Sequence, residues 1–438
     1  MRKTDVIKIL IIGNGAREHA ILRAIKKSSH QSIVFYCAVN QNPAMNLLAK
    51  YCFVENVNMH EKIGSHALNN KIDFAIIGPE APLANGLVDY LNNMNIHCIG
   101  PKKKLAQIES SKGFARDVML EYKISGLPEY KRFSQFNQSD IIACIKTLNN
   151  NYVIKNDGLC GGKGVKVSGE HLHSQEDALN YCREINSEFV IEEKLMGPEF
   201  SLISFTDGET LLHFPPVQDH KRAYENDTGP NTGGMGSYTM ENHLLPFLNQ
   251  QNVRAAEIIN EKMMAALQNK CEERYIGFIY GGFMLTKSGV KVIEFNARLG
   301  DPEALNLLAI LQSDFIELCL LGIEKKLLDF TLSFENKATV VKYLVPMGYP
   351  EKSIESEIKI NNTENNDHYF FGSVKNIGEK LMTMGSRAIA VLGKGETLDQ
   401  AEQQAEHFAS KIKGNIFYRK DIGTHQLIQR YMSMINDF

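Results

Sequence analysis

The residues in this sequence best suited to bind a metal ion and a phosphate together lie at positions 292–303, which read V-I-E-F-N-A-R-L-G-D-P-E. A β-branched and aromatic run and a Lys-Ser-Gly turn precede them, so the pattern predicts a hairpin whose second strand covers 290–298. Side chains alternate along a strand, so Glu294, Asn296 and Arg298 would share one face and Ile293 the apolar other face. A carboxylate and an amide oxygen on one face suit a hard divalent cation that also binds phosphate oxygens. The alternative interpretation is an ordinary solvated strand face.

Length and composition limit what else the chain can be. With 438 residues it exceeds the size of a single core, so about two to four units are expected. A net charge of -3 provides no basic surface for nucleic acid or membranes, which leaves small molecules as partners. The eight cysteines are scattered without C-x-x-C spacing, so they predict reduced thiols rather than disulfides or a zinc site. No apolar run approaches the roughly 18 residues of a spanning helix and no leader is evident, so a cytoplasmic protein is expected.

Short apolar runs alternate with helical patterns over the first hundred residues. The runs cover residues 6–12, 32–37, 51–54, 73–77 and 97–99. This alternation predicts an open, doubly wound parallel sheet with ligand-binding loops at the carboxyl ends of its strands. Arg17 and Glu80 lie on two such loops.

A glycine turn, G-N-G-A-R-E-H-A, joins the first strand to the first helix at residues 13–20. Strand, turn and helix in that order place backbone N–H groups at a helix N-terminus, where they can bind a phosphate. Glu18 occupies the position of the third glycine of the dinucleotide fingerprint, so a nicotinamide cofactor is disfavoured. A plain βα turn without a ligand explains the pattern equally well.

Two further glycine-rich stretches indicate mobile ligand-binding loops. Residues 156–165 follow a predicted strand and contain Lys163, which favours a cationic flap over polyphosphate rather than a Walker A loop. Residues 218–238 combine the cationic start His220, Lys221 and Arg222 with four glycines and no aliphatic periodicity. A stretch of that length predicts an active-site loop or lid in preference to disorder.

The remaining pattern predicts helices and strands around these loops. Helices are expected from 102 onward, at 252–268, as one continuous helix at 304–321, and at 398–412, with strands at 339–345, 369–374 and 387–393. The asparagine- and acid-rich segment 357–367 is expected to be an exposed loop.

Six motifs in order make the chain resemble the phosphoribosylamine-glycine ligase family of the ATP-grasp superfamily, also called glycinamide ribonucleotide synthetases. They are G-N-G-A-R-E-H-A (13–20), I-I-G-P-E-A-P-L (76–83), V-I-K-N-D-G-L-C-G-G-K-G-V (153–165), Q-D-H-K-R with D-T-G-P-N-T-G-G-M-G (218–236), E-F-N-A-R-L-G-D-P-E (294–303) and Y-R-K-D-I-G (418–423). The resemblance implies an α/β fold with an N-terminal doubly wound parallel-sheet domain (1–103), an ATP-grasp domain (104–330) and a small α+β C-terminal domain (331–438). Within the ATP-grasp domain, a flap subdomain would cover about 125–195 and a larger one 196–330.

The resemblance also implies a reaction. Glycine would be ligated to 5-phosphoribosylamine through glycyl phosphate, with ATP cleaved to ADP and phosphate, in the second step of de novo purine synthesis. ATP would be the co-substrate, with Mg²⁺ or Mn²⁺ as the metal. The expected partners are these small molecules, without nucleic acid or membrane, and the expected state is a monomer or weak homodimer.

By the same resemblance, residues of the motifs take specific roles. Lys155, Lys221 and Arg298 would be catalytic, and Glu294 and Asn296 would bind the metal. ATP would be bound by Lys112, Lys155, Gly161, Gly162, Lys163, Gly164, Glu192, Glu193, Lys194, Leu195 and Glu199, with residues 192–195 offering backbone groups to adenine and Glu199 holding the ribose. Phosphoribosylamine and glycine would be bound by Gly13, Asn14, Gly15, Ala16, Arg17, Glu18, Pro79, Glu80, Asp219, Lys221, Arg298, Gly300, Asp301, Pro302 and Glu303, with the sugar phosphate on the 13–16 turn.

The chain also departs from the family pattern. Some departures lie where the family binds through its backbone, so the side chain matters little: Ala16, Asn156 and the pair Cys160-Gly161. Another departure changes side-chain chemistry, because Ala304-Leu305 replace a polar Thr-Gln pair at the edge of the site. The alternatives are another ATP-grasp carboxylate-amine ligase, a nicotinamide-dependent oxidoreductase, and an inactive binding protein. The oxidoreductase needs a G-x-G-x-x-G that is absent, and an inactive protein should have lost Lys155 or Glu294, which are present.

Overall fold

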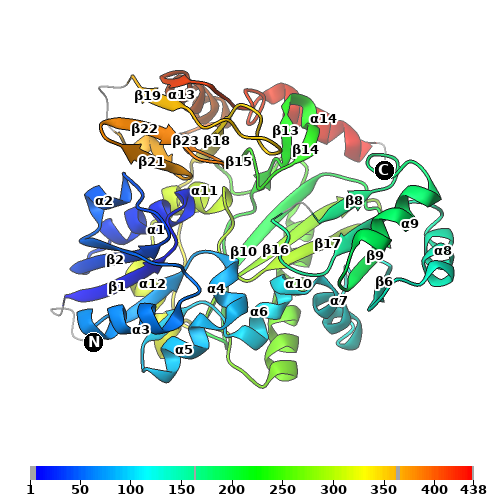
Figure 1. Cartoon of the computed structure of the whole chain (residues 1–438), viewed down its shortest axis with the longest axis horizontal. Helices are drawn as coiled ribbons and strands as arrows, with labels where there is room; N and C mark the ends of the chain where they lie inside the picture. The colour runs from blue at the N-terminus through cyan, green and yellow to red at the C-terminus, as the bar shows by residue number, and fades with distance from the viewer. Residues whose placement is uncertain (1–5, 162–163, 362–365, 437–438) are drawn as a thin grey trace.

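The computed structural model describes residues 6–161, 164–361 and 366–436, and Figure 1 shows their arrangement. The first unit is a parallel sheet of order β3-β2-β1-β4-β5. Its strands are β1 (Ile7–Ile12), β2 (Ser32–Ala38), β3 (Tyr51–Val54), β4 (Phe74–Ile77) and β5 (His97–Ile99), and its helices are α1 (Ala16–Lys26), α2 (Met45–Leu48), α3 (His60–Asn70), α4 (Glu80–Asn85) and α5 (Leu87–Asn93). The chain order reverses between β1 and β4, so the loops that follow these two strands lie side by side, where such folds bind ligands. The predicted doubly wound sheet is confirmed.

Two helices and a small antiparallel sheet follow. The helical stretch after Lys102 is two helices, α6 (Lys103–Ser110) and α7 (Lys112–Glu121), because the Ser111 hydroxyl accepts the Phe114 N–H and caps the second. The sheet has the order β6-β9-β7-β8, formed by β6 (Tyr130–Phe133), β7 (Tyr152–Asn156), β8 (Val165–Val167) and β9 (Phe189–Glu193), with α8 (Gln138–Thr147) and α9 (Gln175–Glu184). Its apolar side chains form a core of their own, so this unit packs as a separate body on the flap side of the site.

The sheet that carries Glu294 and Asn296 has the order β11-β10-β16-β17. It consists of β10 (Glu199–Thr206), β11 (Leu211–His213), β16 (Gly277–Thr286) and β17 (Gly289–Asn296), and α10 (Gln250–Cys271) packs on it. The predicted hairpin is confirmed, but the prediction that Ile293 lies on the packed face is wrong. The register shifts at this position, which leaves Val292 fully buried and Ile293 half-buried. An extra residue in one strand breaks the alternation of side chains, so simple periodicity fails here.

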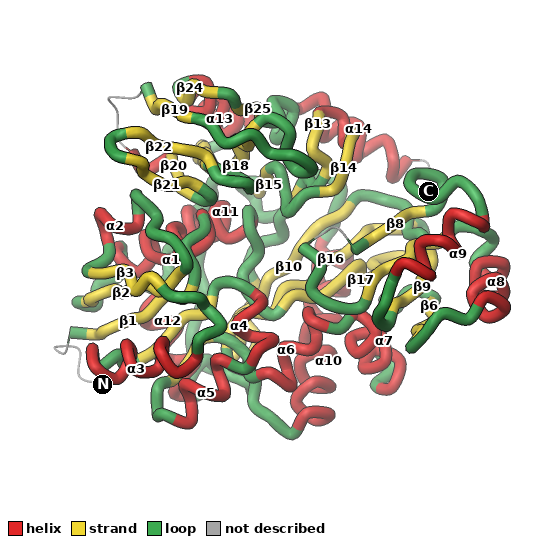
Figure 2. Tube along the Cα trace, viewed as in Figure 1, coloured by secondary structure: helices red, strands yellow, loops and turns green. Residues whose placement is uncertain are grey.

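The C-terminal domain contains two antiparallel sheets, visible in Figure 2 above the N-terminal sheet. One has the order β12-β15-β18-β23-β20, formed by β12 (Gln218–Asp219), β15 (Gly236–Thr239), β18 (Ala338–Pro346), β23 (Ile389–Gly395) and β20 (Tyr369–Phe371), with β25 (Ile416–Phe417) paired to β18. The other contains β21 (Val374–Ile377), β22 (Lys380–Thr383), β19 (Glu357–Ile360) and β24 (Ile412–Gly414). Helices α13 (Leu398–Ser410) and α14 (His425–Asn436) complete the domain. Strands β12 and β15 come from residues before 330 but pair within this sheet. The expected boundary between the ATP-grasp and C-terminal domains at residue 330 therefore stays a prediction.

Three expectations about local structure are wrong. Residues 357–360 form a strand rather than a loop, because β22 and β24 pair with them on both sides. The helix expected at 304–321 is two helices, α11 (Glu303–Ile310) and α12 (Phe315–Glu324), since Asp314 caps the second one. The loop expected at 218–238 consists largely of β12, β13 (Arg222–Tyr224), a 3-10 turn (Glu225–Asp227), β14 (Thr228–Asn231) and β15. No helix in the described parts of the chain is both long and apolar enough to cross a membrane.

Candidate active site

Arg298 lies where the N-terminal domain meets the sheet of β17. Its Nη2 is 2.9 Å from Glu109 Oε1, and its Nε is 3.6 Å from Oε2 of Glu80, the first residue of α4. Arg17, in the first turn of α1, donates from Nη1 to the Leu299 carbonyl at 3.2 Å. Burial opposes the charge on Arg298, yet Glu109 and Glu80 raise its pKa further above its ordinary value. The structure therefore brings the predicted residues Arg17, Glu80 and Arg298 together.

Glu109 is a residue of this site that sequence reasoning missed. Its carboxylate accepts the Ala297 N–H at 2.7 Å in addition to pairing with Arg298, so it fixes both the backbone and the side chain of the motif. Burial raises the pKa of Glu109, although Arg298 lowers it. The available signal was an acidic residue three positions before the predicted ATP ligand Lys112.

Lys221 links the segment between β12 and β13 to β17. Its Nζ is 3.4 Å from Glu199 Oε2 and 3.7 Å from Glu294 Oε1. Burial favours the neutral amine, but Glu199 and Glu294 raise the pKa of Lys221 well above its usual value. For Glu294, burial raises the pKa, but Lys221, Lys155 and Lys112 outweigh burial and bring it to about 2. The carboxylate is therefore ionised at neutral pH in a strongly cationic surrounding.

The donor set at Glu294 and Asn296 fits a magnesium or manganese ion. Both side chains are half-exposed on β17, one offering an anionic oxygen and the other an amide oxygen. Among the described residues no group of three or more acidic, histidine or cysteine side chains surrounds a metal position. A hard cation here would take its remaining ligands from water and phosphate oxygens, which is how magnesium is usually held with nucleotides.

Lys155 and Glu192 form a buried ion pair next to this strand. Lys155 Nζ contacts the Glu192 carboxylate and donates to the Ile293 carbonyl at 3.0 Å. Arg116 donates to the same carboxylate at 2.9 and 3.2 Å. Burial lowers the pKa of Lys155, and although burial would raise the pKa of Glu192, Arg116 and Lys155 lower it. The side chain of Glu192 is thus committed to protein partners, and its backbone lies in β9 between β6 and β7.

The glycine-rich segment after β7 contacts the start of α7. Lys112 Nζ donates to the Gly158 carbonyl at 2.8 Å, so the start of α7 contacts the flap backbone. Gly158 and Gly161 have φ of +140° and +54°, and a Cβ on either would meet no atom within 4 Å. Glycine is therefore needed for backbone conformation rather than for packing. Gly164 adjoins Cys160, and the predicted ligands Gly162 and Lys163 lie outside the described residues.

A cavity of about 630 Å³ adjoins the segment predicted to contact adenine. It is lined by Glu193, Lys194, Leu195, Met196, Gly197, Thr286, Lys287, Ser288, Lys291 and Met434. Lys291 pairs with Glu193 at 3.1 Å, which ties β17 to the end of β9. The cavity therefore lies between the two ATP-grasp subdomains, with Met434 contributed by the C-terminal helix.

The turn between β1 and α1 is closed by the carboxylate of Glu18. The Glu18 carboxylate folds back over the turn, accepting the Gly15 N–H at 2.6 Å and Arg17 Nε at 2.7 Å. A Cβ at Gly13 would lie 2.9 Å from Glu18 Cδ and 3.0 Å from Pro79 Cδ, so the turn needs glycine for this close approach. Binding of the sugar phosphate at the 13–16 turn stays a prediction, and in this structure the Glu18 carboxylate accepts the Gly15 N–H. Arg17 reaches the Leu299 carbonyl, and Glu18 and Pro79 lie beside Gly13.

The G-D-P-E turn is held by the C-terminal domain. Tyr343 donates to Asp301 Oδ1 at 2.6 Å, and Arg387 Nη2 lies 3.0 Å from Asp301 Oδ2. Arg387 Nη1 also donates to the carbonyls of Gly233 (2.7 Å), Gly234 (3.1 Å) and Asp301 (2.8 Å). Sequence reasoning missed Arg387, which clamps this turn to the T-G-G turn before β15. Ala304 and Leu305, which replace the family's polar pair, are fully buried in α11.

We expect the two glycines of the T-G-G turn to respond differently to substitution. Gly234 has φ +111°, and a Cβ there would lie 2.7 Å from both Asp219 Oδ1 and Pro302 Cδ. Gly233 lies outside the left-handed region, and its Cβ would lie 3.2 Å from the Arg387 guanidinium carbon. Strain of about 1 to 3 kcal/mol beside the site predicts at least about a tenfold lower turnover for Gly234→Ala, with Gly233→Ala within about threefold. Equal turnover of the two variants in an ADP-release assay would contradict this.

The buried carboxyl of Glu303 makes the free energy of unfolding decrease as the pH rises. It accepts a hydrogen bond from Tyr280 at 2.9 Å, and burial raises its pKa above the ordinary 4.5. The folded protein therefore binds more protons than the unfolded chain above that pH, so this stabilisation is full below about 4.5 and is lost as pH rises. Glu303→Gln removes this titration, so its free energy of unfolding should improve relative to wild type between about pH 5 and about pH 8. Urea unfolding at both pH values, with exposed Glu176→Gln as control, tests the sign; a constant difference would contradict it.

Comparisons with known proteins agree with this architecture. Residues 7–109, 110–304 and 339–425 match the N, ATP-grasp (A) and C domains of the family described as phosphoribosylglycinamide synthetase. A phosphoribosylamine–glycine ligase of Methanoregula boonei is 44% identical and covers 98% of this chain and 100% of its own length. One of Methanocaldococcus jannaschii is 43% identical, with 98% and 99% covered. The crystal structure of the Thermotoga maritima phosphoribosylamine–glycine ligase superposes with a TM-score of 0.79 at 27% identity, covering 95% of this chain and 100% of that one. The chain therefore belongs to the phosphoribosylglycinamide synthetase family, the ATP-grasp phosphoribosylamine–glycine ligases.

Proposed function

We propose that this protein ligates glycine to 5-phosphoribosylamine and cleaves ATP to ADP and phosphate, which forms glycinamide ribonucleotide for purine synthesis. The observation that carries the proposal is the meeting of three chemical regions in one continuous site. A nucleotide side with Lys155 and Glu294 adjoins Arg298, which in turn contacts Glu80 on the N-terminal domain. The relatives that match the full length of the chain bear this activity in their names.

The residues of the nucleotide side have distinct tasks in this proposal. Lys112 and Lys155 would bind phosphate oxygens, and the flap glycines 161 and 164 would approach them through the backbone. Glu199 would hold the ribose, and residues 192–195 would meet adenine at the 630 Å³ cavity. Glu294 and Asn296 would hold Mg²⁺ or Mn²⁺, which supplies charge neutralisation for the transferred phosphoryl group when bound.

The chemistry would proceed in two displacements. A carboxylate oxygen of glycine attacks the γ-phosphorus, and the bond from that phosphorus to the bridging oxygen of ADP breaks to give glycyl phosphate. The amine of phosphoribosylamine then attacks the acyl carbon, loses a proton, and displaces inorganic phosphate. Among the described residues the buried Nε–H of Arg298 makes only a long ion pair with Glu80 at 3.6 Å and no hydrogen bond, so it would be available to stabilise the negative charge that develops on the acyl phosphate.

The acceptor side would be formed by the domain junction. Arg17, Glu80 and Glu18 surround the end of the N-terminal sheet, while Asp219, Gly300, Asp301, Pro302 and Glu303 lie across from them around Lys221 and Arg298. The sugar phosphate would be bound at the 13–16 turn, where the Gly15 amide donates to Glu18 in this structure. All eight cysteines are free, which fits the reducing cytoplasm.

Omitting each substrate in turn tests the proposed function. ADP release should require ATP, glycine and phosphoribosylamine together, and mass spectrometry should detect glycinamide ribonucleotide in a 1:1 ratio with ADP. Another ATP-grasp ligase would release ADP with a different carboxylate or amine and remain silent with this pair. Full-rate ADP release without glycine would refute the proposal.

A further inference from the structure

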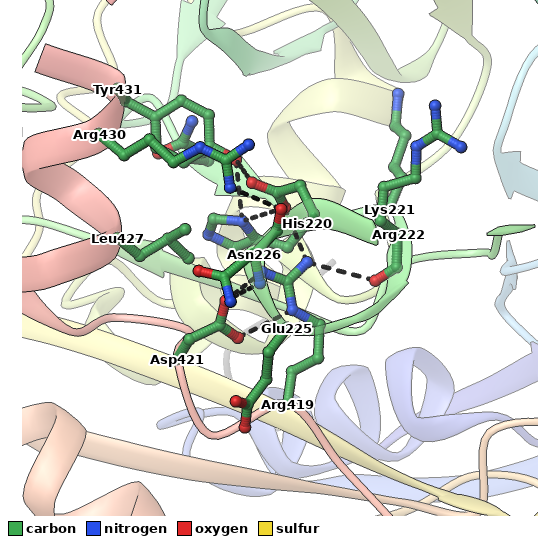
Figure 3. Close-up of polar contacts among 12 residues, drawn as sticks. His220, Lys221, Arg222, Glu225, Asn226, Arg419, Asp421, Leu427, Arg430 and Tyr431 are labelled. Carbon is green, nitrogen blue, oxygen red and sulfur yellow. Dashed lines mark hydrogen bonds and ion pairs between the residues drawn. The ribbon is translucent and has the colours of Figure 1, made fainter. Parts of the chain in front are cut away.

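The Y-R-K-D-I-G motif contains an arginine buried far from the substrate groups. Arg419 is completely buried, and its Nε and Nη2 donate to the two carboxylate oxygens of Asp421 at 2.9 and 2.7 Å. Its Nη1 donates to Asp227 Oδ1 at 2.7 Å and to the Arg222 carbonyl at 3.2 Å. Figure 3 shows this guanidinium beneath the β13–β14 hairpin, joined to it on one side and to the C-terminal segment on the other. A buried charge with every partner satisfied specifies one geometry for the groups around it.

The turn of the hairpin has a conformation that needs outside support. Asn226 and Asp227 both adopt left-handed backbone angles, with φ of +60° and +54°. Consecutive left-handed residues other than glycine persist where the surroundings hold them. The C-terminal segment provides that support: Asp421 Oδ2 accepts the Asn226 N–H at 2.8 Å, and Arg430 donates to the Asn226 carbonyl.

The same support reaches the residue next to Lys221. Tyr431, on α14, donates to Asp227 Oδ2 at 2.6 Å, and Asp227 Oδ1 lies 3.6 Å from Nδ1 of buried His220. The Tyr431 and His220 rings pack with centroids 5.8 Å apart. His220 directly precedes Lys221, and Arg222, whose carbonyl Arg419 binds, directly follows it. The C-terminal segment therefore contacts the residues on both sides of Lys221, the Arg222 carbonyl directly and the His220 side chain through Tyr431 and Asp227.

We propose that Arg419 and Tyr431 are positioning residues that hold Lys221 between Glu199 and Glu294 through Asp227 and the Arg222 carbonyl. The catalytic consequence rests on the proposed function, whereas the effect on the hairpin does not. Among the residues that the structure describes, the side-chain hydrogen bonds of Arg419 and Tyr431 go to Asp421, Asp227, His220 and the Arg222 carbonyl and to none of the predicted substrate-binding side chains, so each acts on Lys221 through the hairpin.

The hairpin also connects to the nucleotide side. Arg222 forms an ion pair with Glu170 of the flap subdomain, and Glu170 pairs with Lys194 at 3.1 Å. Lys194 and Met434, the latter three residues beyond Tyr431 on α14, both line the 630 Å³ cavity. The C-terminal helix thus contacts both the hairpin that carries Lys221 and the cavity predicted for adenine, which makes it a common support for the two halves of the site.

The test compares Arg419→Lys and Tyr431→Phe with Gln426→Ala, a substitution on the exposed side of α14. Lysine keeps the charge but cannot bridge Asp227, Asp421 and the Arg222 carbonyl together. We expect Arg419→Lys to lower kcat at least about tenfold with the KM for ATP within about twofold, and Tyr431→Phe to lower kcat about threefold. Gln426→Ala should match wild type. Released ADP should exceed ligation product in the two positioning variants, because a displaced hairpin admits water to the acyl phosphate.

A double variant separates positioning from general destabilisation. If Arg419 acts through Lys221, adding Arg419→Lys to Lys221→Ala should lower kcat by less than about twofold further. Additive losses, or a lowered melting temperature with unchanged kcat and coupling, would overturn the proposal. Tyr431→Phe removes a single hydroxyl and keeps the test valid if Arg419→Lys does not fold.

Hydrogen exchange distinguishes failure of this proposal from failure of the proposed function. Backbone amides of residues 222–231 should exchange faster in Arg419→Lys than in wild type, whatever reaction the protein catalyses. Unchanged exchange there would overturn the positioning role. A wild-type protein inactive with glycine and phosphoribosylamine would instead refute the function while leaving the exchange result meaningful.

Discussion

Glu294→Ala is expected to lower turnover at least about a hundredfold. A metal ion that neutralises phosphoryl charge lowers the activation free energy by several kcal/mol, and each 1.4 kcal/mol of activation free energy changes the rate about tenfold. Glu294 is ionised and lies within 3.7 Å of Lys221, on the strand that also carries Asn296. Loss of the carboxylate therefore removes one of the two proposed protein ligands to the metal. The measurement is ADP release at saturating ATP across a magnesium titration.

Two controls make the result specific. Glu176→Ala removes an exposed carboxylate on α9 and should leave turnover unchanged. Glu294→Asp keeps the charge on a shorter side chain and should recover part of the activity at high magnesium. Near wild-type turnover of Glu294→Ala at ordinary magnesium would remove Glu294 from the metal site.

Arg298→Ala should lower turnover by about 100- to 1000-fold, the usual loss for one preorganised donor to a developing anion. It should also destabilise the fold by about 3 to 5 kcal/mol, because it leaves the buried Glu109 carboxylate without its partner. A variant with both defects does not by itself separate chemistry from folding.

Removing the carboxylate charge as well separates the two effects. Arg298→Ala with Glu109→Gln leaves no buried unpaired charge at this position, so much of the stability should return. Turnover should stay low, because the donor to the acyl phosphate is still missing. Activity that recovers together with the melting temperature would show that Arg298 acts only in folding.

Local patterns were sufficient to predict the elements that carry the motifs. The buried run of β1 and the hairpin β16–β17 depend on residues close in sequence, whose apolar periodicity and turn residues are visible without the fold. Predictions failed where a strand bulge or a helix cap interrupts the periodic pattern. The examples are the register shift at Ile293 and the N-cap of α12 at Asp314. The strands in residues 218–238 were missed because β15 pairs with β18, which lies about a hundred positions later.

The sequence by itself determined the family, the order of the motifs, and the identity of Lys221, Glu294 and Arg298 as site candidates, because these depend on residue type and spacing. Only the tertiary structure decided which side chains hold those residues in place. Glu109 pairs with Arg298 in a distant part of the chain, Arg387 binds Asp301 from 86 positions away, and Arg419 binds Asp227 from 192 positions away. Such contacts leave no periodic trace in the sequence, since either partner alone reads as an ordinary charged residue. The fold brings the opposite charges together in the protein interior, where a charged side chain without a partner would be strongly destabilising.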